Sequence, residues 1–234
     1  GSRINELLKK TNDATIQDVA LIQMDNESPM AKRALPVMIR ELMMSELNPG
    51  MKEILDLLSQ WDFNLDGNSW EASFFTLWFS KLEEYTWADE LGEKSVDHNW
   101  PNSTEMMEIL EMDINSHWLD NIHTAERETL EMLVIKAFNS AQADLSKKMG
   151  SDHTGWKWHD YRGTNIHHLA KIPGFGAEHL KTSGGRGVPN ATRETFGPSW
   201  RYAAEMGNPV TETLAAYVAQ TILDDNTKRF FLEG

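Results

Sequence analysis

Apolar residues recur every three or four positions over roughly the first 150 residues, the spacing that gathers side chains on one face of an α-helix. The pattern predicts a short helix around Ile4 and Leu8, and a second helix that begins at Thr15, where Asp18 completes a capping box. Further helices are predicted over residues 30–47, 51–61, 70–87, 104–119 and 124–149. We expect Pro36 to end or kink the beginning of the helix that contains it.

The pattern changes after Gly150, where Gly and Pro become frequent and apolar runs become short. Frequent Gly and Pro between short apolar runs are typical of short strands joined by loops. A helical spacing returns over residues 211–231. The sequence therefore predicts an α+β, predominantly helical chain, with a helical region over 1–150, a region of strands and loops over 151–210 and a closing helix over 211–234. We expect these regions to form one structural unit.

Composition narrows the classes of function. The 234 residues include 22 Lys and Arg against 36 Asp and Glu, a formal net charge of −14. A nucleic-acid surface or a membrane-binding basic patch needs clustered cations, so the acidity argues against both partners. Cysteine is absent, which excludes disulfides, thiolate zinc sites and cysteine nucleophiles. No apolar run reaches the roughly 18 residues that would predict a membrane-spanning helix.

One loop has the spacing of a metal site. Asp62, Asn64 and Asp66 place oxygen-bearing side chains at alternate positions, with Gly67 in sixth place, as in a calcium-binding EF-hand loop. The twelfth position of such a loop carries a bidentate Glu, but here it is Ser73, so that ligand is missing. The three side chains are the candidate metal ligands of the chain. The alternative interpretation, which the missing ligand favours, is an Asx-rich turn with Gly67 at positive φ.

Histidines suggest a second metal hypothesis, because five of the eight fall within one stretch. They are His153, His159, His167, His168 and His179. None has the H-E-x-x-H spacing that puts two ligands on one helical face. Two adjacent histidines in a strand point to opposite faces and do not easily chelate one ion. Partner-bonded or exposed histidines are therefore favoured over a zinc centre.

A glycine-rich segment, Gly184-Gly185-Arg186-Gly187, has the composition of a phosphate-binding loop. Such a loop would continue into Lys-Ser or Lys-Thr at the start of a helix. Here Pro189 follows shortly afterwards and removes a backbone donor. The segment is therefore predicted to be a tight turn.

Several segments carry family-like motifs in a fixed order. They are Arg3-Ile4-Asn5-Glu6-Leu7-Leu8, Thr15-Ile16-Gln17-Asp18, Ile22-Gln23-Met24-Asp25 with Ser28 and Ala31, Leu58-Ser59-Gln60-Trp61-Asp62, Trp156-Lys157-Trp158-His159-Asp160-Tyr161-Arg162, Gly184-Gly185 with Asn190-Ala191, and Gly197-Pro198-Ser199-Trp200-Arg201. Together they resemble the C-terminal part of the β-chain of the penicillin acylases (penicillin amidases), which include acyl-homoserine lactone acylases. The family's W-x-W-G segment usually has Gly where this chain has His159, and a Cβ there would alter a close backbone approach.

The resemblance implies an amidase with an αββα sandwich, in which a Ser at the N-terminus of the β-chain attacks the acyl carbonyl and its own amine serves as base. Ser2 does not match, because Gly1 acylates its nitrogen, and Gly1-Ser2 is expected to be a cloning remnant. The family's nucleophile, oxyanion Asn, binding Arg and calcium ligands all precede the motif that contains Arg3. No catalytic, cofactor or metal residue is therefore carried over, although calcium is possible in the intact enzyme.

Three hypotheses about function follow. The first is a β-chain segment of a penicillin acylase-like amidohydrolase, inactive alone, whose partners are the α-chain and the N-terminal part of the β-chain. The family would place that enzyme in the periplasm or outside the cell. The second is a stand-alone or engineered helical scaffold or binding module without catalysis, with self-association left open. The third is a small metal-dependent hydrolase that uses the histidine-rich stretch.

Overall fold

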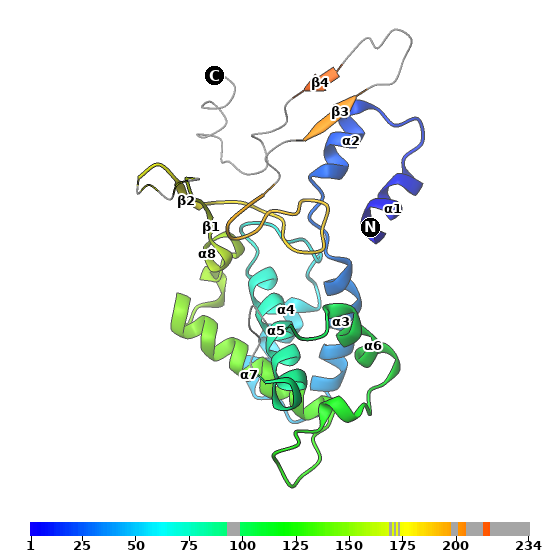
Figure 1. Ribbon diagram of the computed structural model, residues 1–234. Helices are drawn as coiled ribbons and strands as arrows, with labels where there is room; N and C mark the ends of the chain where they lie inside the picture. Colours follow the sequence, from blue (N-terminus) through cyan, green and yellow to red (C-terminus); the bar gives the residue numbers. More distant parts are fainter. Residues whose placement is uncertain are drawn as a thin grey trace. The chain divides into compact units, whose positions relative to one another are not determined.

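The computed structural model in Figure 1 describes residues 1–92, 99–168, 170, 172, 174–197, 201–204 and 213–215. The chain divides into two compact units, each assembled from segments far apart in the sequence. Unit 1 contains Gly1–Pro29, Asp62–Ala72 and Trp156–Gly234, and unit 2 contains Met30–Trp61 and Ser73–Gly155. A unit boundary therefore falls near residue 155, close to the point after Gly150 where Gly and Pro become frequent in the sequence.

Unit 2 is built from helices. It holds nearly all of α3 (Pro29–Leu42), then α4 (Pro49–Leu58), most of α5 (Trp70–Leu91), α6 (Ser103–Met112), the short 3-10 helix η1 (His117–Leu119) and α7 (Leu130–Met149). The predicted helix over 104–119 thus ends early, and α7 begins at residue 130 rather than 124. Its start is fixed by Thr129, whose side chain accepts a hydrogen bond from the amide of Met132 at 3.3 Å.

Pro36 lies inside α3 and does not mark its beginning, so that part of the prediction is wrong. A proline in a helix interior costs about 3 kcal/mol, because it removes a hydrogen bond and crowds the preceding turn. The buried face of α3 offsets this cost, since each fully buried large aliphatic side chain contributes about 1.5–3 kcal/mol. That face contains Ala31, Ala34, Leu35, Met38 and Leu42.

The core of unit 2 is aromatic. The ring of Phe138 lies 4.9 Å from that of Phe74 and 5.1 Å from that of Trp78, both in edge-to-face geometry. Trp78 also donates its indole N–H to the carbonyl oxygen of Val134 at 3.0 Å, so its one polar atom is paired. These contacts join α5 to α7, and they follow from the apolar spacing of both helices.

Unit 1 combines short helices and short strands. The helices are α1 (Ser2–Lys10), α2 (Ile16–Gln23) and α8 (Trp158–Arg162). The short 3-10 helix η2 (His153–Gly155) belongs to the end of unit 2. Strand β1 (Thr164–Ile166) pairs antiparallel with β2 (Ala177–Leu180), with an irregular register between Thr164 and Ile166. Strand β3 (Tyr202–Ala204) pairs antiparallel with β4 (Thr213–Ala215). The capping box predicted at Thr15 and Asp18 is present.

The predicted α+β, predominantly helical class is confirmed. The closing helix predicted over 211–234 lies outside the described residues except at Thr213–Ala215, where the chain is a strand instead. Pairing with β3 supplies the backbone partners there. The αββα sandwich implied by the resemblance stays a prediction. In the described part of the chain, no helix is both long and apolar enough to cross a membrane.

Candidate functional site

A glycine turn in unit 1 brings two stretches of backbone so close together that side chains are excluded. Gly184 has a φ of 85°, and a Cβ there would lie 2.1 Å from the carbonyl oxygen of Asn190. A Cβ on Gly185 would lie 2.7 Å from Cδ1 of Leu65. The amides of Gly184 and Gly185 donate to Leu65 O at 2.8 Å and Asn190 O at 3.0 Å. They are therefore not available to cradle a phosphate, and the segment is a turn.

Asn190 joins three segments of unit 1. Its side chain is almost fully buried, and its Oδ1 accepts from Arg201 Nη2 at 2.9 Å and from Thr192 Oγ1 at 3.0 Å. Its Nδ2 donates to Asn26 Oδ1 at 2.9 Å, and its backbone amide donates to Asp25 O at 3.0 Å. A buried carboxamide with these partners fixes its neighbours in one arrangement.

Arg162, the last residue of α8, is half-buried and is a second centre of hydrogen bonds. Its partners are the carbonyl oxygens of Thr182, Gly184 and Thr192 and the hydroxyls of Thr164 and Thr182. The guanidinium also lies 5.1 Å from the ring of Trp158, a cation–π distance. Burial lowers the pKa of Arg162 to about 10, against the opposing charge of Glu194. The side chain therefore stays charged at neutral pH and fastens backbone segments together.

Arg201 plays a similar part beside α2. Its Nη1 donates to the carbonyl oxygen of Gln23, and its Nη2 donates to Asn190 Oδ1. Gln23 in turn donates through Nε2 to the carbonyl oxygen of Tyr202 at 3.1 Å. Burial lowers the pKa of Arg201 to about 10, which still leaves it protonated. The two family-like motifs that contain Gln23 and Arg201 are thus bonded to each other directly.

The segment Trp156-Lys157-Trp158-His159 is fastened to the 62–72 loop. The amides of Trp158 and His159 donate to the carbonyl oxygens of Ser69 at 3.0 Å and Gly67 at 2.9 Å. The indole of Trp158 donates to Gly184 O at 2.7 Å. His159 is buried, and its Nδ1 lies 2.8 Å from Asp160 Oδ1. The imidazole therefore packs inside the network rather than opening a site.

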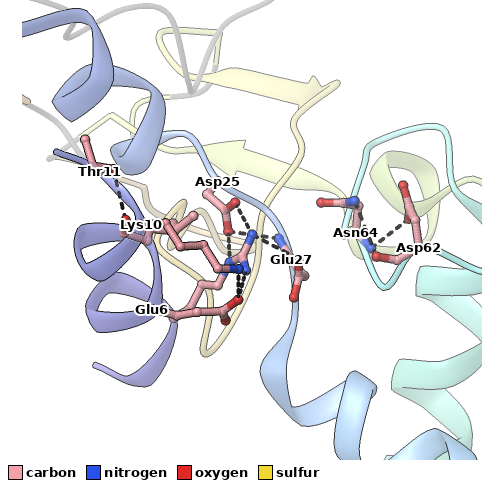
Figure 2. A network of polar contacts seen from close by, with 9 residues as sticks. Glu6, Lys10, Thr11, Asp25, Glu27, Asp62 and Asn64 are labelled. Atoms are coloured by element: carbon pink, nitrogen blue, oxygen red, sulfur yellow. Dashed lines mark hydrogen bonds and ion pairs between the residues drawn. The ribbon is translucent and has the colours of Figure 1, made fainter. Parts of the chain in front are cut away.

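The candidate metal ligands are engaged in local turns. Asp62 Oδ1 accepts from the amide of Asn64 at 2.9 Å, and Figure 2 shows the two side chains together. Asp66 Oδ1 accepts from the amide of Asn68 at 2.9 Å. Among the described residues, no three His, Asp or Glu side chains are grouped so that they could hold a metal ion.

The backbone strain of this loop is not where the sequence predicted it. Phe63 has a φ of 63°, whereas Gly67 is outside the positive-φ region, so the prediction for Gly67 is wrong. Hydrogen bonds on both sides hold Phe63 in this conformation: Phe63 O accepts from Ser28 N at 2.9 Å, and Leu65 N donates to Asn26 O at 3.0 Å. Long-range pairing therefore decides which residue is strained.

The five clustered histidines have separate surroundings. His153 begins η2, His159 is buried in α8, and His179 lies in β2 with a φ of 55°. His167 and His168 are exposed after β1. The structure does not bring them together as a ligand set within the described residues.

A group of charged side chains ties α1 to the segment after α2 (Figure 2). Arg3 donates to both carboxylate oxygens of Asp25, at 2.9 and 2.8 Å, and pairs with Glu27 at 2.9 Å and Glu6 at 3.1 Å. Lys10 pairs with Glu6 at 2.6 Å. The hydrogen bond from Lys10, then that from Arg3, lowers the pKa of Glu6 to about 2. The pKa of Arg3 is raised, chiefly by its hydrogen bond to Asp25.

Taken together, these contacts form a framework. We call the residues Asp25, Asn26, Trp158, Arg162, Gly184, Gly185, Asn190 and Arg201 the motif junction. The family-like motifs contain all of these residues except Asn26, but the sequence did not predict that Arg162 would bond three carbonyls. The only signal for Arg162 was its position four residues after Trp158 in a family-like segment.

Comparison with known proteins agrees with the order of these motifs. No curated protein gives a significant match to the chain. The family model described as Penicillin amidase matches residues 1–221, a range that includes every segment of the motif junction. Since this match covers nearly the whole sequence, the chain belongs to the penicillin amidase family.

Proposed function

We propose that this chain is a C-terminal β-chain segment of a penicillin acylase-like amidohydrolase, and that it serves as framework rather than as the source of the nucleophile. In the intact enzyme the reaction would be hydrolysis of linear amide or N-acyl bonds, as in penicillin side chains or N-acyl homoserine lactones. The family match supports the hydrolase class. The motif junction is the observation that carries the framework role.

The chemistry of the junction supports this assignment. Arg162 and Arg201 direct their guanidinium groups at neutral oxygens of the chain itself, and Arg3 is bonded to carboxylates on its own unit. A group that binds a substrate or an oxyanion needs donors aimed at the reacting atoms. The terminal guanidinium nitrogens of Arg162 and Arg201 instead donate to other segments of unit 1. The partners we expect are the α-chain and the nucleophile-bearing part of the β-chain.

Activity measurements test the proposal directly. Purified chain is mixed with a chromogenic phenylacetyl amide and, separately, with a fatty-acyl amide. We expect no hydrolysis by the chain alone, and hydrolysis after co-expression with family segments that carry an N-terminal Ser. Turnover by the pure chain, abolished when Ser2 is replaced by Ala, would contradict the framework role.

The binding-module hypothesis predicts a different outcome. A stand-alone module would unfold cooperatively as a monomer and would not restore activity with any nucleophile-bearing segment. Failure of co-expression, together with cooperative unfolding of the pure chain, would therefore favour that alternative.

A further inference from the structure

Two consecutive acidic residues lie at the C-terminal end of α5, in unit 2. Asp89 and Glu90 are both half-buried, and one oxygen of each, Asp89 Oδ1 and Glu90 Oε2, is buried and accepts no hydrogen bond while both carboxylates are ionised. The C-terminus of a helix carries partial negative charge, which opposes carboxylates placed there. Two such carboxylates cannot both be charged at low cost, because a buried charge without a partner is strongly destabilising.

Asp89 also holds a loop. Its other oxygen, Oδ2, accepts a hydrogen bond from the amide of Ile122 at 2.8 Å. The loop, residues 120–128, is closed on itself by Glu128, whose Oε2 accepts from the amide of Asn121 at 2.9 Å and whose own amide donates to Asp120 Oδ1 at 3.1 Å. Asp89 therefore connects α5 to this loop.

The charges that face Glu90 are negative. Asp89 on α5 and Asp120 on the loop both act on it, and Glu128 is bonded to Asp120. Arg127 on the loop donates to the carbonyl oxygen of Asn115, and Lys136 on α7 lies over the ring of Tyr85. Neither cation is bonded to Glu90 in the part of the chain that the structure describes. Burial first, then the hydrogen bond and charge of Asp89, raises the pKa of Glu90 to about 7.

We infer that Glu90 and Asp89 form a proton-dependent clasp: a proton on Glu90 bridges it to Asp89, so that Asp89 can hold the Ile122 amide, and release of that proton to solvent loosens the 120–128 loop. An edge-to-face contact, with ring centres 5.4 Å apart, joins Trp87 on α5 to Trp118 on η1. Trp87 lies two residues before Asp89, and Trp118 lies two residues before Asp120. Loosening of the loop therefore weakens an aromatic contact as well.

The direction of the effect follows from linkage. The folded chain holds the Glu90 proton more tightly than the unfolded chain, whose Glu titrates near 4.5. The stabilisation from the protonated pair is complete below that value and is lost as the pH rises through about 7. The loop is thus closed in mildly acidic solution and opens in mildly alkaline solution.

Hydrogen exchange of the whole chain tests the clasp. The protection factor of the Ile122 amide, corrected for its intrinsic rate, is measured by NMR from pH 5.5 to 8.5. We expect it to fall about tenfold across neutrality, because the hydrogen bond to Asp89 is weakened. In Glu90→Gln, whose amide still donates to Asp89 but does not titrate, the protection should stay constant over the same range.

Two further variants keep the test decisive. Glu84→Gln removes an exposed carboxylate from the same helix, paired with Lys81, and should behave like the unmodified chain. Asp120→Asn removes a negative neighbour of Glu90 and should move the transition to lower pH. A flat profile in the unmodified chain, or an unchanged transition in Glu90→Gln, would overturn the inference. If Glu90→Gln does not fold, the Asp120→Asn variant decides the test: a midpoint at the same pH as in the unmodified chain would overturn the inference.

Discussion

The two units of this chain have different kinds of interior. Unit 2 buries apolar rings, with Phe74, Trp78 and Phe138 inaccessible to solvent. Unit 1 buries polar groups, among them Asn190, which is 1% exposed, and Arg201, which is 7% exposed. The first kind of core is stabilised by area removed from water, which is not directional. The second is weakened whenever a buried donor or acceptor loses its partner.

This difference accounts for where the family-like motifs gather. An apolar core accepts another side chain of similar volume at modest cost. A buried polar network does not, because removing one partner leaves another group unpaired. The motif junction therefore needs particular residue types at particular positions, whereas the helices of unit 2 need only a periodic pattern. Four predictions test this contrast, from the largest expected effect to the smallest.

Phe138→Ala should be the most damaging change in unit 2. It removes a fully buried ring that contacts Phe74 and Trp78, and large-to-small changes of this kind cost about 3–5 kcal/mol. The free energy of unfolding from urea titration measures the loss. Met132→Ala, on the same helix but 44% exposed, should change stability by less than about 1 kcal/mol. Equal effects of the two variants would contradict the aromatic core.

Gly184→Ala should destabilise unit 1 by about 2–4 kcal/mol, because the new Cβ would meet the Asn190 carbonyl and the backbone has positive φ. Gly187→Ala is the matched control. Gly187 has a φ of 82° but nothing within 4 Å of an added Cβ, so only the backbone cost of about 1 kcal/mol should appear. Urea unfolding followed by near-UV circular dichroism separates the two, and a difference near zero would argue against the close approach.

Arg162→Met should cost about 2–3 kcal/mol, because it leaves the carbonyls of Thr182 and Thr192 without their donor in a buried site. Arg186→Met removes an exposed arginine from the neighbouring turn and should be nearly neutral. Thermal unfolding of both variants at the same pH provides the comparison. Two equally stable variants would mean that Arg162 is not a fastening point.

The smallest effect concerns the exposed charges of α1. Glu6 should titrate near pH 2 in NMR spectra of the folded chain. Because its pKa is lowered, its contribution to stability is present above 4.5 and is lost as the pH falls towards 2. Lys10→Gln should raise the pKa of Glu6 more than Arg3→Gln does, since the hydrogen bond from Lys10 has the larger effect. The reverse order would contradict the shorter contact that Glu6 makes with Lys10, 2.6 Å against 3.1 Å with Arg3.

Prediction from sequence succeeded where local pattern decides structure. The helices of unit 2, the capping box at Thr15 and the turn at Gly184 were all readable, because apolar periodicity, capping chemistry and glycine act over a few residues. Two of the errors share one origin. Pro36 within α3 and the positive φ at Phe63 are local costs that distant contacts overcome, and no short window of sequence contains those contacts.

The sequence by itself determined the helical class, the acidic character and, through the order of its motifs, the family. Only the tertiary structure decided what the motif residues do. Asn26 and Asn190 are 164 positions apart and share one hydrogen bond, and Arg201 reaches back to Gln23 across 178 positions. Closing the chain between such distant pairs costs conformational entropy, and a short window of sequence does not contain both partners. The pairs form because a buried polar group left without a partner is costly.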